Sequence, residues 1–283
     1  MSITSSSVLV ELNISVWTAN KLDREATSTV TGDNNATRDA AKVHKNLMAG
    51  TSLRKDIANF AQSTRTWHNS RTLPWNDGGA RLLPTSLFLD YRTESKERND
   101  RFNELVDAFV SNYPALVTTA GQHLGSLFDA DDYPSPAAVK DKFALKLTFS
   151  PVPEAGDFRL DVSSRELEEL KQSYNDSFQD RLTEAMKEPW DRLHKVLTGM
   201  SDKLTVGGDD DKKRYHDSFI TNAEDLCGLL QHLNVANDPK LERARKELEQ
   251  TIAGTTIDEL RADAYSRQDL KSKLDVMIKD IEW

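Results

Sequence analysis

The chain begins with a regular alternation of apolar and polar residues. From Val8 to Val16 every second residue is Val, Leu or Ile, and this period of two predicts a β-strand. The alternation returns at residues 145–149 and 158–162, on either side of a stretch that contains Pro and Gly, and predicts a β-hairpin. Since two strands alone are marginally stable in water, we expect the N-terminal strand to complete a three-stranded antiparallel sheet that packs on helices.

Most of the remaining apolar residues recur at steps of three and four, as in amphipathic helices. This spacing predicts short helices near residues 38–48 and at 52–67, and a long helix from Pro84 to about residue 127. Pro114 lies within the long helix and predicts a kink. Residues 18–37 have few apolar positions and many turn formers, so we expect a long loop of weak order.

A very long helix is predicted to follow the hairpin. Ser163 and Glu166 have the spacing of a capping box, in which each side chain bonds a free backbone amide of the first turn. An apolar stripe with steps of three or four continues to Leu204, and Pro189 is expected to kink or split the helix. Three further helical patterns, which predict an antiparallel hairpin or bundle, lie at residues 215–233, 241–252 and 257–281.

These elements predict an α+β protein that is mainly α-helical. A small three-stranded antiparallel sheet, from the N-terminal strand and the hairpin near residues 144–162, packs on helices, and a long helical arm or bundle forms the C-terminal part. The sequence divides at residue 162 into an α+β part, residues 1–162, and a helical part, residues 163–283. Because the sheet would pair residues near 10 with residues near 150, one continuous structural unit stays an open alternative.

Composition is that of an ordinary globular protein. The 283 residues are 37% hydrophobic and 29% charged, and the low numbers of Gly (12) and Pro (9) favour helices over a sandwich or barrel. The single cysteine, Cys227, excludes an intramolecular disulfide and fits a reducing compartment such as the cytoplasm. The N-terminus lacks the features of a signal peptide, and no apolar run approaches the length of a membrane span, so we expect no membrane association.

A search for catalytic motifs finds none. The sequence has no phosphate-binding loop, no H-E-x-x-H and no G-x-S-x-G, and its six histidines lack the spacing that places two metal ligands on one helical face. Residues 129–132 resemble the start of a calcium loop without its glycine and terminal glutamate. We therefore expect no metal, no cofactor and no catalytic residue, and we do not expect an enzyme.

Residues 64–84 interleave aromatic rings, arginines and turn formers more densely than any other stretch. They overlap a basic region, residues 38–81, which has eight basic and three acidic residues. The whole chain, by contrast, has a net charge of −9. In one interpretation the rings stack on bases and the arginines neutralise phosphates. In the favoured one the tryptophans anchor a turn in the core and the arginines cover apolar surface or pair with acidic helices. The candidate residues for nucleic-acid or partner binding are Arg65, Trp67, His68, Arg71, Trp75 and Arg81.

Several segments carry a resemblance to a known family: LNISVWT, TWHNSRTLPWNDGGARLLP, NYPALV, LFDADDYPS and TFSPVPEAGDFRLDV. With these, roughly residues 8–162 resemble a family of uncharacterised proteins from tailed bacteriophages and prophages, classified as a domain of unknown function. The resemblance implies a host-cytoplasmic phage protein. It also implies an AAA+ ATPase as partner, since genes of the family look to be neighbours of phage genes for such an ATPase and for a von Willebrand-type protein.

The leading functional hypothesis is a non-catalytic phage accessory protein that acts through protein interaction and self-assembly. It relies on the long helix with an apolar stripe, since such stripes need a partner face. The alternative is a single-stranded nucleic-acid-binding or annealing protein in phage replication or recombination, with single-stranded DNA as a possible partner. Its support is the basic aromatic stretch. A weaker alternative is an inhibitor of a host defence protein that uses an acidic, DNA-like surface.

Overall fold

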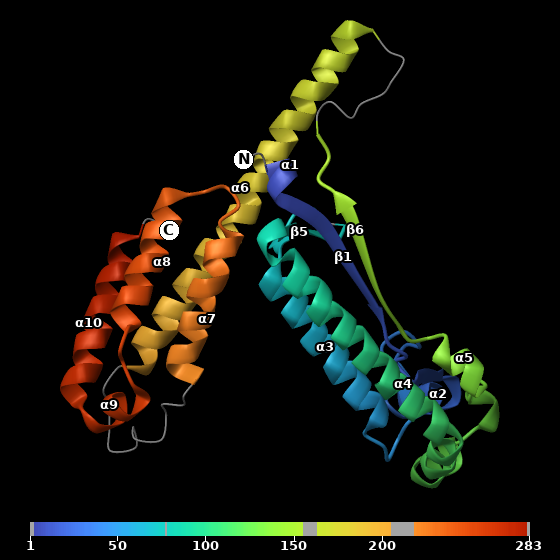
Figure 1. The fold of residues 1–283 in the computed structure, drawn as a ribbon. Helices are drawn as coiled ribbons and strands as arrows, with labels where there is room; N and C mark the ends of the chain where they lie inside the picture. The colour runs from blue at the N-terminus through green and yellow to red at the C-terminus, as the bar shows by residue number, and fades with distance from the viewer. Residues whose placement is uncertain (1–2, 77, 155–162, 205–217, 282–283) are drawn as a thin grey trace. The chain divides into compact units, whose positions relative to one another are not determined.

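The computed structural model describes residues 3–76, 78–154, 163–204 and 218–281 (Figure 1). The chain packs as two compact units, each built from segments that are far apart in the sequence. The bundle unit comprises residues 1–11, 69–91 and 148–283. The α3–α4 unit, named after its two long helices, comprises residues 12–68 and 92–147. The predicted division at residue 162 stays a prediction, because packing alone does not establish which segments fold independently.

In the described part of the chain, four strands form the main sheet, in the order β4-β5-β1-β6. β1 (Ser7–Ser15) confirms the predicted N-terminal strand, and its neighbour β6 (Ala144–Pro151) confirms the first strand of the predicted hairpin. The predicted second strand, residues 158–162, lies outside the described residues. The predicted number of three strands was wrong, because β4 (Leu73–Pro74) and β5 (Ala80–Pro84) also belong to the sheet.

Both additional strands come from residues 64–84, the stretch in which the sequence predicted a turn. β5 pairs antiparallel with β1 and with β4, and Leu73, Leu82 and Leu83 are fully buried. The Asn76 side chain accepts a hydrogen bond of 3.1 Å from the backbone N–H of Ala80 and so closes the turn between β4 and β5. The turn residues were recognisable, but strands of two and five residues are too short to show a period of two.

The predicted loop at residues 18–37 was also wrong. This region holds β2 (Asn20–Asp23) and α2 (Arg24–Asp33). The Asp23 side chain caps α2 by accepting a hydrogen bond of 2.9 Å from Ala26 N–H, and Thr27 and Thr31 donate to backbone carbonyls one turn earlier. Hydrogen bonds from polar side chains thus stabilise a helix whose sequence has little apolar periodicity.

Residues 38–48, predicted as a helix, instead contain β3 (Val43–Asn46), which pairs antiparallel with β2. The backbone N–H of Val43 donates to the Thr27 hydroxyl at 3.0 Å, which ties β3 to α2. Two buried side chains follow β3, Leu47 and Met48, so the apolar residues of this segment mark its contact with the core and not a helical face.

The predicted helices that follow are confirmed as α3 (Leu53–Arg71) and α4 (Phe88–Leu124). α4 is preceded by the 3-10 turn η1 (Thr85–Leu87) and continues through Pro114. Three short elements lie between α4 and β6: η2 (Gly125–Leu127), η3 (Ala130–Asp132) and α5 (Pro136–Lys140). The short helix α1 (Ile3–Ser6) precedes β1. The buried core of the α3–α4 unit consists of Ala19, Leu47, Met48, Ile57, Ala61, Phe102, Val106, Phe109, Tyr113, Val139 and Phe143.

Any side chain at Gly50, in the α3–α4 unit, is expected to destabilise the fold. Its φ of +80° lies in the left-handed region, and a Cβ atom there would be 2.3 Å from Cδ2 of His123. We expect Gly50→Ala to lower the free energy of unfolding by about 1–2 kcal/mol even if the imidazole turns away, because the backbone strain remains. Chemical denaturation would measure this loss.

The matched control for Gly50 is Gly199, which lies inside a helix and has nothing within 4 Å of the position that an added Cβ atom would take. Gly199→Ala is expected to raise the free energy of unfolding by about 0.5–1 kcal/mol, because glycine weakens helix interiors. Equal changes for the two variants would contradict the assigned strain at Gly50.

The bundle unit contains α6 (Ser164–Lys203), α7 (Ser218–Leu233), α8 (Pro239–Ile252), α9 (Ile257–Ala262) and α10 (Ala264–Asp280). The predicted capping box is confirmed, with Ser163 N–H donating to Glu166 at 3.0 Å. α6 is not split at Pro189. The pattern at residues 257–281 forms two helices because Asp263 ends α9 and caps α10.

The core of the bundle unit is apolar and draws on α6, α7, α8, α9 and α10. α6 contributes to it only from Met186 onward. None of the helices in the described part of the chain combines the length and apolarity that crossing a bilayer requires. The buried core side chains include Leu193, Leu197, Met200, Leu204, Leu226, Leu230, Leu241, Leu248, Leu270 and Leu274.

Candidate functional site

The six residues predicted to bind nucleic acid or a partner do not belong to one unit. Arg65, Trp67 and His68 lie on α3 in the α3–α4 unit. The other three, Arg71, Trp75 and Arg81, belong to the bundle unit.

The side chains of the first group are occupied by neighbours. Trp67 is 7% exposed, its indole N–H donates to the Glu94 carboxylate, and the guanidinium of Arg98 lies 4.8 Å from its ring centroid. His68 is buried as well. Arg65 donates to the backbone carbonyl of Ile14 at 2.9 Å. A base could not stack on the Trp67 ring without displacing this cation–π contact.

The second group anchors the β4–β5 hairpin. Trp75 is 4% exposed and packs edge to face on Phe178 of α6, with 5.2 Å between ring centroids. Arg81 donates from Nε to the Thr72 hydroxyl at 2.7 Å and pairs with Glu188 of α6 at 3.0 Å. These contacts are those of the favoured interpretation, in which tryptophans anchor a turn and arginines pair with an acidic helix. Nucleic-acid binding by this stretch stays a prediction.

Glu188 and Arg192 of α6 also contact this part of the chain, although the sequence did not single them out. Arg192 donates to the carbonyls of Asn69 at 2.6 Å, Ser70 at 2.7 Å and Thr72 at 3.0 Å, at the C-terminal end of α3. Its guanidinium also pairs with Glu188 at 2.5 Å, so Glu188 lies between Arg192 and Arg81. A cation at the last carbonyls of a helix offsets the negative end of the helix dipole. In the sequence, Glu188 and Arg192 form an ordinary surface pair at spacing four, which is why they were missed.

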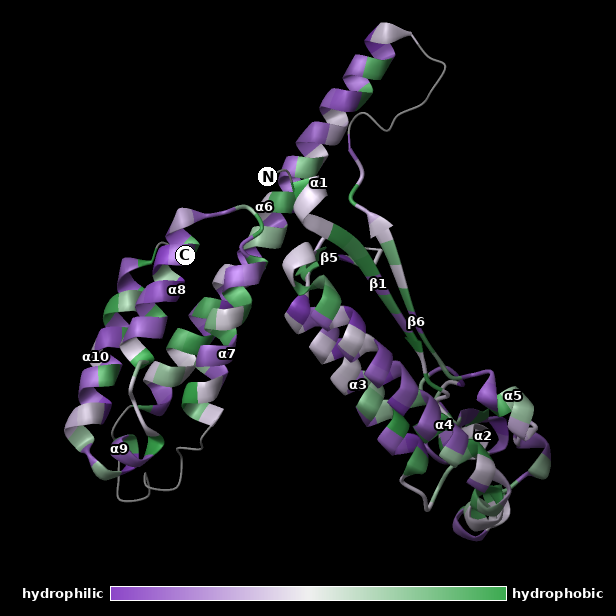
Figure 2. Ribbon diagram, viewed as in Figure 1, coloured by the Kyte–Doolittle hydropathy of each residue, from purple (hydrophilic) through white to green (hydrophobic). Residues whose placement is uncertain are grey.

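The N-terminal half of α6 differs from the rest of the bundle unit. We call residues 164–184 the α6 arm; none of them is buried. Figure 2 shows apolar residues recurring among hydrophilic ones along this part of the helix. Leu170 is 37% exposed, and Leu167 and Leu182 are half-buried. The arm therefore has an apolar stripe that the described residues leave partly in contact with water.

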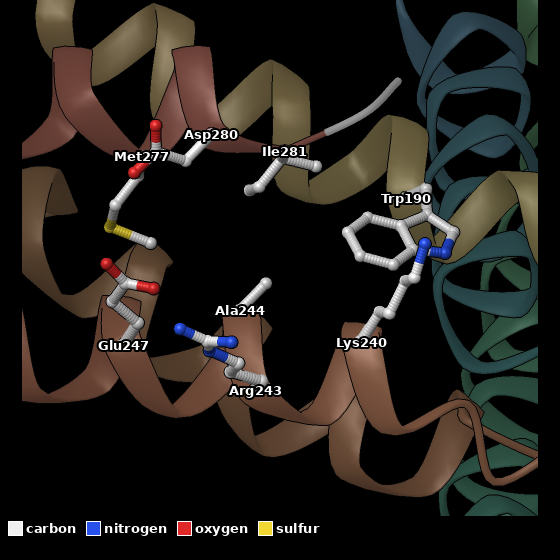
Figure 3. Close-up of a pocket in the computed structure, with 8 residues that line it drawn as sticks. All are labelled: Trp190, Lys240, Arg243, Ala244, Glu247, Met277, Asp280 and Ile281. Carbon is white, nitrogen blue, oxygen red and sulfur yellow. The ribbon is translucent and has the colours of Figure 1, made fainter.

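A pocket of about 360 Å³ opens between α6, α8 and α10 (Figure 3). Its lining combines apolar walls, among them Trp190 and Met277, with exposed charged side chains such as Arg243 and Glu247. None of the described lining residues has a hydroxyl, thiol or imidazole group. Trp190 is held by a hydrogen bond of 3.1 Å from its indole N–H to Asp238.

Other groups with catalytic potential are engaged in packing. Cys227 is buried in the bundle core, and burial, with a contribution from Glu249, raises the pKa of its thiol to about 11. The thiol is therefore protonated at neutral pH and a poor nucleophile. Within the described ranges, no cluster of three or more His, Cys, Asp or Glu side chains could hold a metal ion.

Comparisons of this chain with protein-family models, with curated proteins and with solved structures find no match.

Proposed function

We propose that this chain is a non-catalytic accessory protein that acts through protein–protein interaction and self-assembly. The observation that carries the proposal is the α6 arm, a helical segment of about five turns with an apolar stripe and no buried residue. Water contact with apolar surface costs about 25 cal/mol per Å², so covering such a stripe with a second helix stabilises an assembly.

The setting we propose is a tailed bacteriophage, with the protein in the host cytoplasm and an AAA+ ATPase as a further partner. The support is the resemblance of the segments between residues 8 and 162 to the uncharacterised phage family. Single-stranded DNA binding receives less support, because the six candidate side chains lie in two units and the tryptophan rings are buried.

The self-assembly is tested by one charge change on the arm. We expect the wild-type protein to form oligomers, and Leu170→Glu to weaken self-association by tenfold or more, since burying one leucine contributes about 1.5–3 kcal/mol. Sedimentation equilibrium over a range of concentrations would measure the change. The helical circular dichroism signal should stay the same, because Leu170 contributes to no buried core.

Val276→Glu provides the matched control. Val276 is an apolar residue of α10 that is 52% exposed, outside the α6 arm, and the same charge change there should leave the mass unchanged. A wild-type protein that is monomeric at all concentrations and retains no phage AAA+ ATPase in a pull-down would contradict the proposed function. Equal effects of the two variants would remove the arm as the interface.

A further inference from the structure

A groove with a volume of about 740 Å³ lies in the α3–α4 unit. We call it the β2–α2 groove; it is lined by residues 21–26 of β2 and α2, by Thr29, Val30 and Lys45, and by residues 126–129 with Asp132. Three large apolar side chains in its wall are well exposed: Leu22 by 39%, Val30 by 41% and Leu127 by 43%. Among the described residues of the α3–α4 unit, no other large apolar side chain is so exposed.

A buried charge cluster lies beside these apolar side chains. Asp132 is 7% exposed, and its two carboxylate oxygens are each 2.5 Å from an ammonium group, Oδ1 from Lys21 and Oδ2 from Lys45. Both contacts are short ion pairs of one buried carboxylate. Lys45 also donates to the carbonyl of Leu127 at 3.0 Å and lies 3.8 Å from Asp23.

This cluster has one negative charge in excess. Hydrogen bonding to Asp132 raises the pKa of Lys45, and burial opposes this rise. The negative charges of Asp132, Asp23 and a third carboxylate, Asp129, raise the pKa of Lys45 further. Two ammonium groups and three carboxylates thus line the same groove. The remaining charged side chains of the groove, Arg24 and Glu25, have opposite signs and leave the excess unchanged.

We propose that the β2–α2 groove binds an apolar protein segment that carries a lysine or arginine, whose cation meets Asp129. The apolar side chains of the segment cover Leu22, Val30 and Leu127. The cation balances the third carboxylate at the edge of a partly buried site, where charge pairs are stronger than in bulk water. An acidic segment would add to the excess negative charge, and a neutral one would leave it uncompensated. The proposal rests on the proposed function, since it names the chemistry of a protein partner.

Two synthetic amphipathic helical peptides of equal length serve as probes, with leucine on the apolar face and either lysine or glutamine on the polar face. Fluorescence anisotropy measures their binding to the full chain. We expect the lysine peptide to bind the wild type about tenfold more tightly than the glutamine peptide. Asp129→Asn should remove most of this preference, because it removes the charge while an asparagine can still cap η3 as Asp129 does.

The apolar contribution is tested separately. Leu127→Ser and Val30→Ser should each weaken both peptides by about threefold to tenfold. Val276→Ser, at an exposed apolar residue of the bundle unit, is the control and should leave both affinities unchanged. A lysine preference that persists in Asp129→Asn, or equal binding to the wild type and the serine variants of the groove, would overturn the proposal.

The outcomes also separate this proposal from self-assembly. If Leu127→Ser lowers the oligomeric mass, a second copy of the chain occupies the groove and the cationic partner is wrong. In another outcome, Leu170→Glu leaves the oligomeric mass unchanged, while the wild type prefers the lysine peptide and Asp129→Asn does not. The α6 arm is then not the interface, but the proposed binding by the groove is supported.

Discussion

Replacing Asp132 with asparagine is expected to lower the free energy of unfolding by about 3 kcal/mol at neutral pH. Removing one partner of a buried ion pair typically costs about 3–5 kcal/mol, because the remaining charge loses its nearest partner. We expect the lower end of that range, since the Lys21 side chain is 50% exposed and Lys45 keeps Asp23 at 3.8 Å. Urea denaturation of the wild type and the variant would measure the loss.

The control for Asp132 lies in the same unit. Asp107 pairs with Lys140 at 2.7 Å, but both side chains are more than half exposed. Asp107→Asn should change the free energy of unfolding by less than about 1 kcal/mol, because exposed ion pairs contribute little. If both variants lose equally little, the Lys21–Asp132–Lys45 cluster does not stabilise the α3–α4 unit.

The stability of the wild type and that of Asp132→Asn should depend differently on pH. Burial raises the pKa of the Asp132 carboxyl, but hydrogen bonds and charges from Lys21 and Lys45 lower it more, so the folded-state pKa lies below the ordinary value of 3.8. The contribution of a carboxyl with a lowered pKa is complete above its unfolded-state pKa and is lost as the pH falls through the folded-state value. The difference between wild type and Asp132→Asn should therefore be constant near neutral pH and shrink below about pH 4.

Arg192→Ala is expected to give the second largest loss, about 2–3 kcal/mol in the free energy of unfolding. The Arg192 side chain is 18% exposed, and its guanidinium donates to three carbonyls at the end of α3 and pairs with Glu188. Hydrogen bonds to charged groups contribute about 1.5–3 kcal/mol each, and water can replace part of that at the more exposed carbonyls. Thermal and urea denaturation should agree on the loss.

Arg165→Ala, on the same helix, is the matched control for Arg192. Arg165 is 89% exposed and pairs with Glu169 one turn further along α6, so its loss should change the free energy of unfolding by less than about 0.5 kcal/mol. Arg192→Lys should lie between the two, because an ammonium group cannot reproduce the planar fork of a guanidinium. A loss for Arg192→Ala no larger than that of Arg165→Ala would show that the contact with α3 contributes nothing.

The sequence alone predicted the elements whose signals are local and repeated. The period of two in β1 and the steps of three and four in α3, α4 and the bundle helices extend over many residues. Each repeated apolar residue lies on the same face of its element and supports the same prediction. The capping box at Ser163 and Glu166 involves residues three positions apart, so it was also visible. The elements that escaped prediction, β2 to β5 and α2, are short or are stabilised by polar side chains such as Asp23 and Thr27.

The sequence also could not predict the contacts of the candidate site residues with distant segments. The density of rings and arginines in residues 64–84 marked the stretch, but their roles depend on partners far away in the chain: Arg81 meets Glu188 across 107 positions, and Trp75 meets Phe178. The sequence by itself determined the helical character, the long stripe of α6 and the absence of known catalytic motifs. Only the tertiary structure decided that Trp67 and Trp75 are buried, that Arg192 caps α3, and that Leu22, Val30 and Leu127 meet in one groove. Helix and strand periods follow from the backbone geometry of neighbouring residues, whereas these contacts require distant segments to pack together.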